Sequence, residues 1–291
     1  MKVLITGAGG QVAQALMSER PPGVEVKSLT RAQLDICDGG AASAWVNEFA
    51  PDVIVNAAGF TAVDKAESDP QAANGANAAG PRSLALAARD LQNRCRLIHI
   101  SSDYVFDGNG NRAIRPQDKT HPLSVYGRSK LAGEEAVVEV LGERCVVLRT
   151  AWVYGAVGHN FLHTMLRLMR ERGSVRVVSD QIGTPTSTPA LARALWQLAL
   201  QPGLSGLHHW SDAGVASWYD FAVAIAEEGA VLGLLPMGVK VSPISTEEYP
   251  TPAVRPRFAV LDKRATAKAL GMEPAHWRVR LREVLGSLQG G

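Results

Sequence analysis

Short apolar runs alternate with amphipathic segments through the first half of the chain. The runs are rich in Val, Ile and Leu, as strands are, whereas the segments between them repeat apolar positions with a helical period. We predict strands over Lys2–Thr6, Glu25–Leu29, Asp52–Ala57, Arg96–Ile100 and Arg144–Thr150. The helices expected between them are Gln11–Glu19, Ala41–Phe49, Pro81–Asp90 and Ser124–Val140. This alternation predicts an α/β fold with a Rossmann-type, doubly wound parallel sheet.

The rhythm changes after Trp152, where helices mix with isolated strands and Pro250, Pro252 and Pro256 mark a loop. The elements expected here are helices at Phe161–Arg172, Thr188–Leu200, Trp218–Glu228, Asp262–Leu270 and His276–Leu288, with strands at Val175–Val178 and Gly206–Trp210. We divide the chain into a Rossmann domain over residues 1–151 and a smaller mixed α/β lobe over residues 152–291, some segments of which return to the first sheet. Open α/β sheets bind ligands at the carboxyl ends of their strands, so this lobe is expected to cover that edge.

A glycine-rich turn, Gly7-Ala8-Gly9-Gly10, joins the first predicted strand to the first predicted helix. Glycines let a backbone turn tightly and approach a pyrophosphate, which the free N–H groups of the helix N-terminus then bind. Ala13 stands where the last glycine of the usual fingerprint would lie, a position that a close helix–strand contact tolerates. The turn therefore indicates a dinucleotide site.

The choice of dinucleotide depends on the residues after the second strand. NAD-binding proteins usually carry an acid there for the ribose 2′-hydroxyl, but this chain reads Ser28-Leu29-Thr30-Arg31. Arg31 is suited to a 2′-phosphate, or it is a solvated loop residue. Asp35 follows and is a competing ribose or adenine contact. We favour NADPH and keep NADH as the alternative.

Tyr126 and Lys130 are four residues apart on a predicted helix and so share one face. A nearby ammonium favours the phenolate and is expected to lower the tyrosine pKa, which makes Tyr126 a general acid toward a carbonyl oxygen. Ser102 follows the fourth strand and would polarise the same oxygen, unless it only caps the strand end. These three residues are the predicted catalytic group of a hydride-transferring enzyme.

Two further residues are candidates for substrate contacts. Asp103 follows Ser102 and would accept hydrogen bonds from substrate hydroxyls, or it only forms the turn. Trp152 ends the fifth strand region and would cover a sugar ring, or it belongs to the core.

The chain resembles the dTDP-4-dehydrorhamnose reductases, within the extended short-chain dehydrogenase/reductases, from residue 1 to about 290. Their pattern is matched by Gly10-Gln11-Val12, Pro51–Ala58, Thr61-Ala62-Val63-Asp64-Lys65-Ala66-Glu67, Ser101–Phe106, Tyr126–Glu134, Arg149–Tyr154, Asp180–Thr186 and Tyr249–Pro252. The block from Thr61 and the blocks of the second half are more discriminating than the Tyr126–Lys130 spacing.

The resemblance implies NAD(P)H-dependent reduction of the 4-keto group of dTDP-4-dehydro-L-rhamnose to dTDP-L-rhamnose. The dinucleotide contacts that it implies are Gly10, Gln11, Val12, Asp35, Ile36, Gly59, Phe60, Thr61, Tyr126 and Lys130. Gly7 of the glycine turn and Arg31 after the second strand complete the predicted set. The substrate contacts implied are Ser102, Asp103, Trp152 and Arg255. Two alternatives stay open: a reductase of another nucleotide 6-deoxy-4-ketohexose, and a non-catalytic regulatory subunit of the same fold.

Composition adds exclusions. The net charge is +2, which implies no strong attraction to nucleic acid or to membranes. The three cysteines form no Cys-x-x-Cys pair, which favours a reducing, cytoplasmic location and no zinc site. Some members of the resembled family join a dimer through Mg²⁺ held by glutamates, but Ala15 stands at one such position. We therefore expect no metal, and either a monomer or a metal-independent dimer.

The sequence departs from the resembled family after Arg255-Pro256, where Arg257-Phe258-Ala259 replaces a segment that often contains Asn-Ser. The substrate contacts of this segment are therefore the least certain part of the resemblance.

Overall fold

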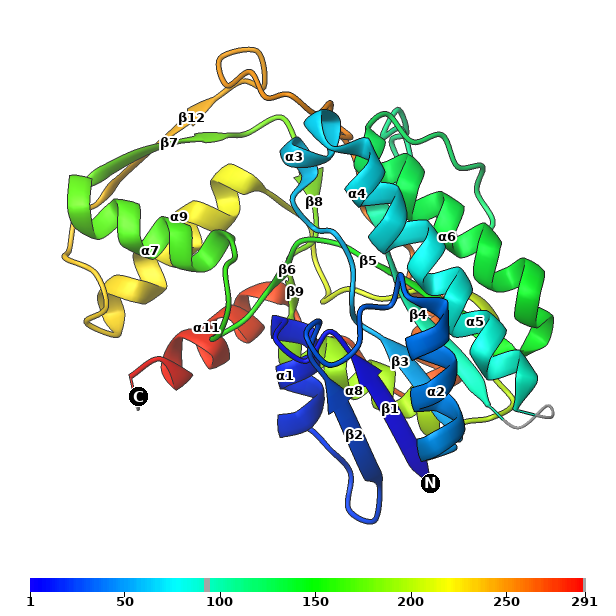
Figure 1. Cartoon of the computed structure of the whole chain (residues 1–291). Coiled ribbons are helices and arrows are strands. Elements are labelled where there is room, and N and C mark those ends of the chain that lie inside the picture. The colour runs from blue at the N-terminus through cyan, green and yellow to red at the C-terminus, as the bar shows by residue number, and fades with distance from the viewer. Residues whose placement is uncertain (92–94, 290–291) are drawn as a thin grey trace.

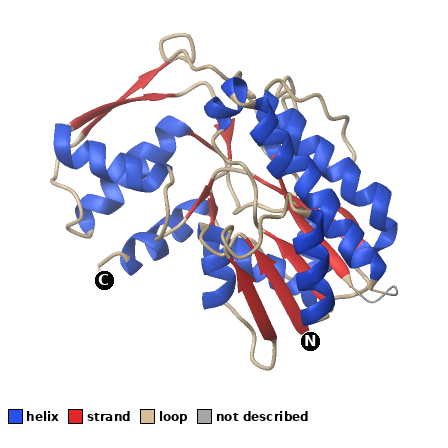
Figure 2. Cartoon of the chain, viewed as in Figure 1, coloured by secondary structure: helices blue, strands red, loops and turns tan. Residues whose placement is uncertain are grey.

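A computed structural model describes residues 1–91 and 95–289 and contains one six-stranded sheet in the order β10-β5-β4-β3-β1-β2 (Figures 1 and 2). All of its pairings are parallel. The strands are β1 (Lys2–Thr6), β2 (Glu25–Leu29), β3 (Val53–Asn56), β4 (Arg96–Ser102), β5 (Cys145–Thr150) and β10 (Gly206–His209). The predicted α/β class with a parallel Rossmann-type sheet is confirmed.

Helices cover both faces of this sheet because its central strands are apolar on both sides. All four residues of β3 are buried. On one face lie α2 (Gly39–Phe49), α5 (Gly80–Asp90) and α6 (Val125–Leu141), which pack on one another around a core that includes Leu84 and Val137. On the other face, α1 (Gln11–Ser18) packs against α8 (Thr188–Leu200), around a core that includes Leu16 and Trp196.

Two elements from the second half of the chain are part of the Rossmann unit: one strand of its sheet and one helix that covers it. Strand β10 pairs in register with β5, and α8 covers the same face as α1. Most of the remainder forms the smaller lobe of Figure 1, where α7 (Phe161–Arg172) and α9 (Trp218–Val231) pack beneath a ribbon of β7 (Ser174–Val178) and β12 (Lys240–Ile244). The helix α10 (Arg264–Leu270) instead packs against α8 and β10. The division at residues 151 and 152 stays a prediction, and residues 290–291 of its second unit lie outside the described residues.

The remaining elements of the second half are short or terminal. Two two-stranded pairings join β6 (Val153–Tyr154) to β9 (Thr186–Ser187) and β8 (Ile182–Gly183) to β11 (Ala216–Ser217). The chain ends in α10 (Arg264–Leu270) and α11 (Trp277–Ser287).

Local capping explains where several helices of the second half begin and end. Asn160 caps α7 by accepting a hydrogen bond from the His163 amide, and Gly173 ends it with a left-handed φ of 67°. Ser217 and Asp220 form a reciprocal capping box at the start of α9. The sequence pattern predicted these helices within a few residues.

The segment between β3 and α5 was not predicted to be helical. It contains α3 (Val63–Ser68), α4 (Pro70–Asn74) and a π-helical turn, η1 (Gly75–Ala79). This segment packs against α6, and the contact is unusually close. A Cβ atom on Gly133 of α6 would overlap the carbonyl oxygen of Asn77 in η1. A glycine is therefore required at this point.

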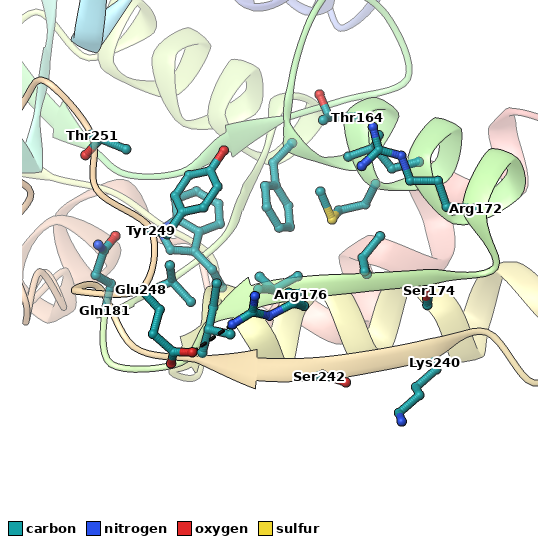
Figure 3. A pocket seen from close by; sticks show the side chains of 18 of the residues that line it. Thr164, Arg172, Ser174, Arg176, Gln181, Lys240, Ser242, Glu248, Tyr249 and Thr251 are labelled. Atoms are coloured by element: carbon teal, nitrogen blue, oxygen red, sulfur yellow. Dashed lines mark hydrogen bonds and ion pairs between the residues drawn. The ribbon is translucent and has the colours of Figure 1, made fainter.

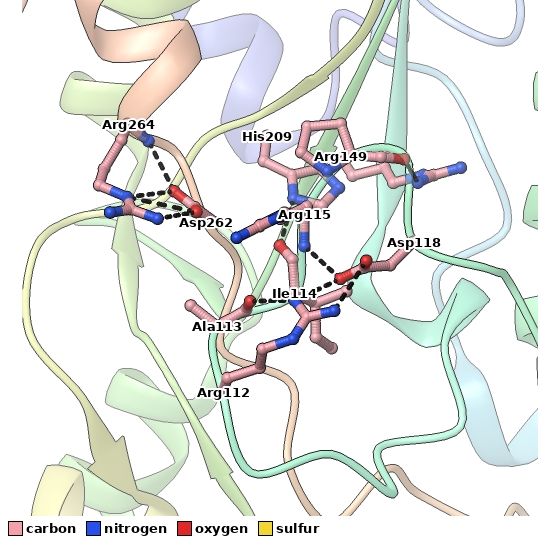
Figure 4. A network of polar contacts seen from close by, with 10 residues as sticks. Arg112, Ala113, Ile114, Arg115, Asp118, Arg149, His209, Asp262 and Arg264 are labelled. Atoms are coloured by element: carbon pink, nitrogen blue, oxygen red, sulfur yellow. Dashed lines mark hydrogen bonds and ion pairs between the residues drawn. The ribbon is translucent and has the colours of Figure 1, made fainter.

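The long connection between β4 and α6 is fixed by buried and exposed charges (Figure 4). Arg149 of β5 donates to both carboxylate oxygens of Glu134 on α6, at 2.9 and 2.6 Å, and to the Pro116 carbonyl at 3.0 Å. Nearer the surface, Arg112 donates to both oxygens of Asp118 at 2.8 and 2.9 Å. The buried pair joins α6 to the sheet. Separating the two residues would leave an uncompensated charge in the interior, which is costly.

Gly133→Ala should destabilise the protein by about 1–3 kcal/mol, because α6 must shift to relieve the overlap with Asn77. Urea unfolding followed by circular dichroism measures this. Gly286→Ala in α11 is the matched control, since a Cβ there meets nothing within 4 Å and alanine should be neutral or stabilising. Equal effects of the two substitutions would contradict the packing argument.

Candidate active site

Polar groups gather at the carboxyl ends of β1, β3 and β4, which is the edge where parallel sheets bind ligands. Thr6 of β1 donates to Asn56 of β3 at 2.7 Å, and the Asn56 amide contacts the Nδ1 atom of His99 on β4 at 3.1 Å. All three side chains are buried. Burial and the nearby Lys130 charge lower the pKa of His99, so its ring is neutral.

The glycine turn has the shape that a bound pyrophosphate needs. Gly7 has a φ of 76°, and a Cβ atom there would lie 2.8 Å from the backbone of Ala58. Gly10 donates to the Gly7 carbonyl at 2.8 Å and precedes α1 without a side-chain cap. The first N–H groups of α1 therefore have no side-chain partner at the Ncap position, which suits an anion.

Two of the expected dinucleotide residues at this turn have further structural contacts. The Gln11 side chain donates to the Val153 carbonyl at 3.2 Å and accepts from Asn160 at 3.2 Å, so it joins the glycine turn to the smaller lobe. Val12 packs against the core beside α8.

A second loop, residues 57–62, is held by a residue that sequence reasoning missed. The Asn77 side chain accepts from the Phe60 amide at 2.8 Å and donates to the Phe60 carbonyl at 3.0 Å. It also donates to the Ser129 hydroxyl on α6 at 3.0 Å. Asn77 thus positions the loop that carries Gly59 and Thr61 relative to the helix that carries Lys130. A buried asparagine in a polar, small-residue segment gave no signal of this.

Tyr126 lies in the first turn of α6, which is fixed by two caps. The Ser124 hydroxyl accepts from the Gly127 amide at 3.1 Å, and Glu67 of α3 accepts from the Val125 amide at 2.8 Å. The Tyr126 ring packs edge-on against Tyr104, with centroids 5.3 Å apart.

The expectation that Lys130 lowers the Tyr126 pKa is wrong for this structure. Burial raises the pKa of Tyr126 to about 12, opposed by the Ser102 hydroxyl and reinforced by Asp103. Lys130 instead donates from Nζ to the Ile100 carbonyl at 2.6 Å. Burial lowers the pKa of Lys130 to about 8, while Glu134 opposes that shift.

Ser102 and Asp103 form a hydrogen-bonded pair beside Tyr126. The Ser102 hydroxyl accepts from the Tyr104 amide at 3.2 Å and lies 2.8 Å from Oδ1 of Asp103. Asp103 is 2% exposed, and its Oδ2 atom has no partner among the described residues. Burial raises the pKa of Asp103 to about 7, against the opposing effect of the Ser102 hydrogen bond. Ser102 thus caps the end of β4 and Asp103 lies in the turn that follows, as the alternative interpretations expected. Both roles are compatible with a part in the reaction.

The two residues that compete for the cofactor ribose contact each other. Arg31 lies 3.5 Å from Asp35, and their side chains are 87% and 44% exposed. The Cys37 amide donates to Asp35 at 3.0 Å and is the main cause of the lowered pKa of Asp35. Ile36 is buried beside Gly80, where a Cβ atom would lie 2.6 Å from its side chain.

Trp152 has a left-handed φ of 48° and stacks on Trp218, with ring centroids 3.5 Å apart. Trp218 also lines a pocket of about 840 Å³ in the smaller lobe (Figure 3). This pocket does not contain Ser102 or Tyr126 in its lining, but it does contain Arg255. Arg255 donates to both oxygens of Asp64 at 3.0 and 2.7 Å. Burial raises the pKa of the neighbouring Tyr104, and the positive charge of Arg255 partly opposes that rise.

The structure therefore brings together Ser102, Asp103 and Tyr126, with Lys130 on the nearby Ile100 carbonyl of β4. Arg255 lines the pocket of the smaller lobe. Arg31 and Thr61 lie exposed, outside that buried group. No group of three His, Cys, Asp or Glu side chains that could hold a metal ion occurs within residues 1–91 and 95–289. Over the same part of the chain, no helix is long and apolar enough to cross a membrane.

Comparisons with known proteins identify the family of this chain. The model of the family described as the RmlD substrate binding domain matches residues 1–289. The chain is 40% identical over 285 residues to the spore coat polysaccharide biosynthesis protein SpsK of Bacillus subtilis, which covers 98% of this chain and 96% of that protein. It is 42% identical over 294 residues to dTDP-4-dehydrorhamnose reductase of Streptomyces griseus, which covers 99% and 94%.

Two solved structures are also similar over almost their whole length. The dTDP-4-dehydrorhamnose reductase of Clostridium acetobutylicum superposes with a TM-score of 0.92 at 38% identity, covering 99% of this chain and 100% of that one. The same enzyme of Bacillus anthracis, in complex with NADP, gives 0.91 at 33% identity, covering 98% and 99%. The expected resemblance is confirmed, and the chain belongs to the RmlD substrate binding domain family.

Proposed function

We propose that this chain catalyses the NADPH-dependent reduction of the 4-keto group of dTDP-4-dehydro-L-rhamnose, which yields dTDP-L-rhamnose. The observation that carries the proposal is the convergence of Ser102, Tyr126 and Lys130 at the carboxyl end of β4. Relatives that are 37–42% identical over nearly the whole chain are named as this reductase, and one structural neighbour was solved with NADP. A regulatory subunit without turnover would need no such group of reactive side chains.

The described residues fit a dinucleotide. Gly7 leaves room that a Cβ would fill against Ala58, and Gly59 leaves room that a Cβ would fill against Asn77. The pyrophosphate would lie at the N-terminus of α1, beside Gly10, Gln11 and Val12. Lys130 would hold the nicotinamide ribose, since its ammonium has donors beyond the one given to Ile100. Asp35 and Ile36 would flank the adenine end.

When bound, NADPH supplies the hydride that reduces the carbonyl carbon. The protein supplies the proton and the orientation. Tyr126 donates its phenolic proton to the carbonyl oxygen as negative charge develops there. Lys130 would hold the nicotinamide ribose, with the donors that remain beyond its hydrogen bond to the Ile100 carbonyl. Ser102 hydrogen bonds at the same oxygen and fixes the carbonyl relative to Tyr126.

The pocket of the smaller lobe would take the nucleotide part of the substrate. Phe161, Trp218 and Tyr249 supply aromatic faces for a base, whereas Arg176 and Arg255 supply guanidinium groups for a diphosphate. Both guanidiniums form ion pairs with carboxylates: Arg176 with Glu248 at the exposed surface, and the more buried Arg255 with Asp64. Trp152, stacked on Trp218, would lie between base and sugar.

An activity assay with the proposed substrate tests this function directly. Purified protein, NADPH and dTDP-4-dehydro-L-rhamnose should give a fall in absorbance at 340 nm and a product that comigrates with dTDP-L-rhamnose. Other nucleotide 6-deoxy-4-ketohexoses, offered at equal concentration, should give a lower kcat/KM. A higher kcat/KM for one of them would reassign the sugar, and no turnover with any would favour the regulatory alternative.

Tyr126→Phe should lower kcat by about 10²–10⁴-fold, because it removes the proton donor and leaves the ring in place. Binding of NADPH, measured by fluorescence titration, should change little. Tyr219→Phe in α9 is the control, because that tyrosine lies in the smaller lobe and should leave kcat unchanged. A kcat of wild-type size for Tyr126→Phe would remove this residue from the reaction.

Lys130→Met should weaken NADPH and NADH equally, by roughly ten- to a hundredfold, because it removes a charged hydrogen bond to the ribose that both cofactors share. Lys268→Met on the surface of α10 is the matched control. Unchanged affinity for both cofactors would show that Lys130 serves only the Ile100 carbonyl.

Arg31→Ala should weaken NADPH by roughly ten- to a hundredfold and leave NADH nearly unchanged, because the guanidinium would contact only the 2′-phosphate. Asp35→Ala tests the competing role, since an Asp35 that binds the ribose would lose NADH affinity. Titrating both cofactors against both variants separates the two. Equal losses of NADPH and NADH in Arg31→Ala would mean that Arg31 does not recognise the phosphate.

A further inference from the structure

The hydroxyl of Ser102 is almost fully used by its neighbours. It accepts from the Tyr104 amide at 3.2 Å and lies 2.8 Å from Oδ1 of Asp103. It also adjoins the Tyr126 phenol, where it opposes the rise in pKa that burial causes. A serine hydroxyl has one proton and two lone pairs, so three neighbours decide between them where that proton points.

The charge on Asp103 decides the direction. A carboxylate only accepts hydrogen bonds, so a charged Asp103 takes the Ser102 proton. Ser102 can then only accept from Tyr126, and Tyr126 directs its proton away from a carbonyl. A neutral Asp103 donates to Ser102 instead. Ser102 is then free to donate toward Tyr126 or the carbonyl oxygen, and Tyr126 directs its proton at the substrate.

The surroundings of Asp103 favour the neutral form. Its Oδ2 atom is buried and has no hydrogen-bond partner within residues 1–91 and 95–289, and a neutral carbonyl oxygen is less costly in that state than a charged carboxylate oxygen. Tyr104 neighbours it on its own turn, and Tyr126 faces it from α6. The cation Lys130 on α6 donates to Ile100, and the cation Arg255 is paired with Asp64 near Tyr104. Neither cation forms a direct contact with Asp103 among the described residues.

We propose that Asp103 is a positioning residue that takes part in the reaction as a neutral carboxylic acid, and that its proton directs the Ser102 and Tyr126 hydroxyls toward the carbonyl. This inference rests on the proposed reductase function. As the carbonyl carbon gains the hydride and NADPH is oxidised, the substrate oxygen takes the Tyr126 proton. Tyr126 takes the Ser102 proton, and Ser102 takes that of Asp103. One O–H bond forms on the product, one breaks on Asp103, and solvent later returns the proton to the carboxylate.

The first test is the pH dependence of kcat/KM. Burial raises the pKa of Asp103 to about 7, so the wild type should lose kcat/KM tenfold per pH unit above that value. In Asp103→Asn the amide donates to Ser102 at every pH but cannot release a proton, so kcat/KM should be lower than in the wild type throughout while its dependence on the carboxyl group disappears. Its profile should therefore lack the fall near pH 7 and keep only a later one, as Lys130 with a pKa of about 8 loses its charge.

Asp107→Asn, on the exposed connection after η2 (Asp103–Val105), is the matched control and should keep the wild-type profile. A wild-type kcat/KM that rises through pH 7 would show that the charged carboxylate is the working form and overturn the proposal. An Asp103→Asn profile with an unchanged limb near pH 7 would overturn it as well.

The second test needs no turnover, so it separates this inference from the proposed function. A carboxyl group whose pKa is raised on folding loses stability as pH rises from its unfolded value, near 4, through its folded value, near 7. The Tm of Asp103→Asn minus that of the wild type should therefore increase between pH 5 and pH 8. The infrared band of protonated carboxylic acids at pH 5 should be stronger in the wild type than in the variant. Asp212, whose pKa burial raises to about 6, contributes to the band in both proteins, so the difference between them reports Asp103. A constant Tm difference together with equal bands in the two proteins would contradict a neutral Asp103.

Discussion

The close contact between α6 and the π-helical turn at Asn77 determines how the two halves of the candidate site are arranged. Gly133 lets the helix approach, and the Asn77 side chain then bonds both backbone groups of Phe60 and the Ser129 hydroxyl. The loop expected to carry the cofactor and the helix that carries Tyr126 and Lys130 become one rigid unit. A shift of about 1 Å between reacting groups can cost a hundredfold in rate, so this rigidity bears directly on catalysis.

Burial is the common cause of the unusual protonation states in the site. It raises the pKa of Tyr126 and of Asp103 and lowers that of Lys130. Each of these groups is therefore held in an environment that disfavours its charged form, which is where enzymes place residues that exchange protons. The buried pair of Glu134 and Arg149 is different, because each of its charges is matched by the other: the pair is bidentate and further bonded to Pro116.

The sequence pattern predicted the strands of the parallel sheet and most helices because apolar periodicity is a local property. It missed residues 63–79, since these helices are short and polar, and it missed β12, which contains Pro243. Ser102, Tyr126 and Lys130 could be proposed as a catalytic group from spacing and order along the chain. The contacts of Asn77 and the raised pKa of Asp103 could not be predicted, because both depend on burial and on the folded surroundings. The pKa shift expected from Lys130 failed for the same reason, since spacing along a helix does not reveal what Nζ contacts.

The pocket of the smaller lobe and the hydroxyl group at β4 are joined by a short series of contacts. Arg255 lines the pocket and is paired with Asp64, and its charge acts on Tyr104, whose ring meets that of Tyr126. An anionic ligand that drew Arg255 away from Asp64 would change the field at Tyr104 and at the buried group behind it. Because Tyr104 also donates its amide to Ser102, the same turn connects the pocket with the hydroxyl whose proton direction matters most. The pocket and the candidate proton donor are therefore connected by contacts that pass through one three-residue turn.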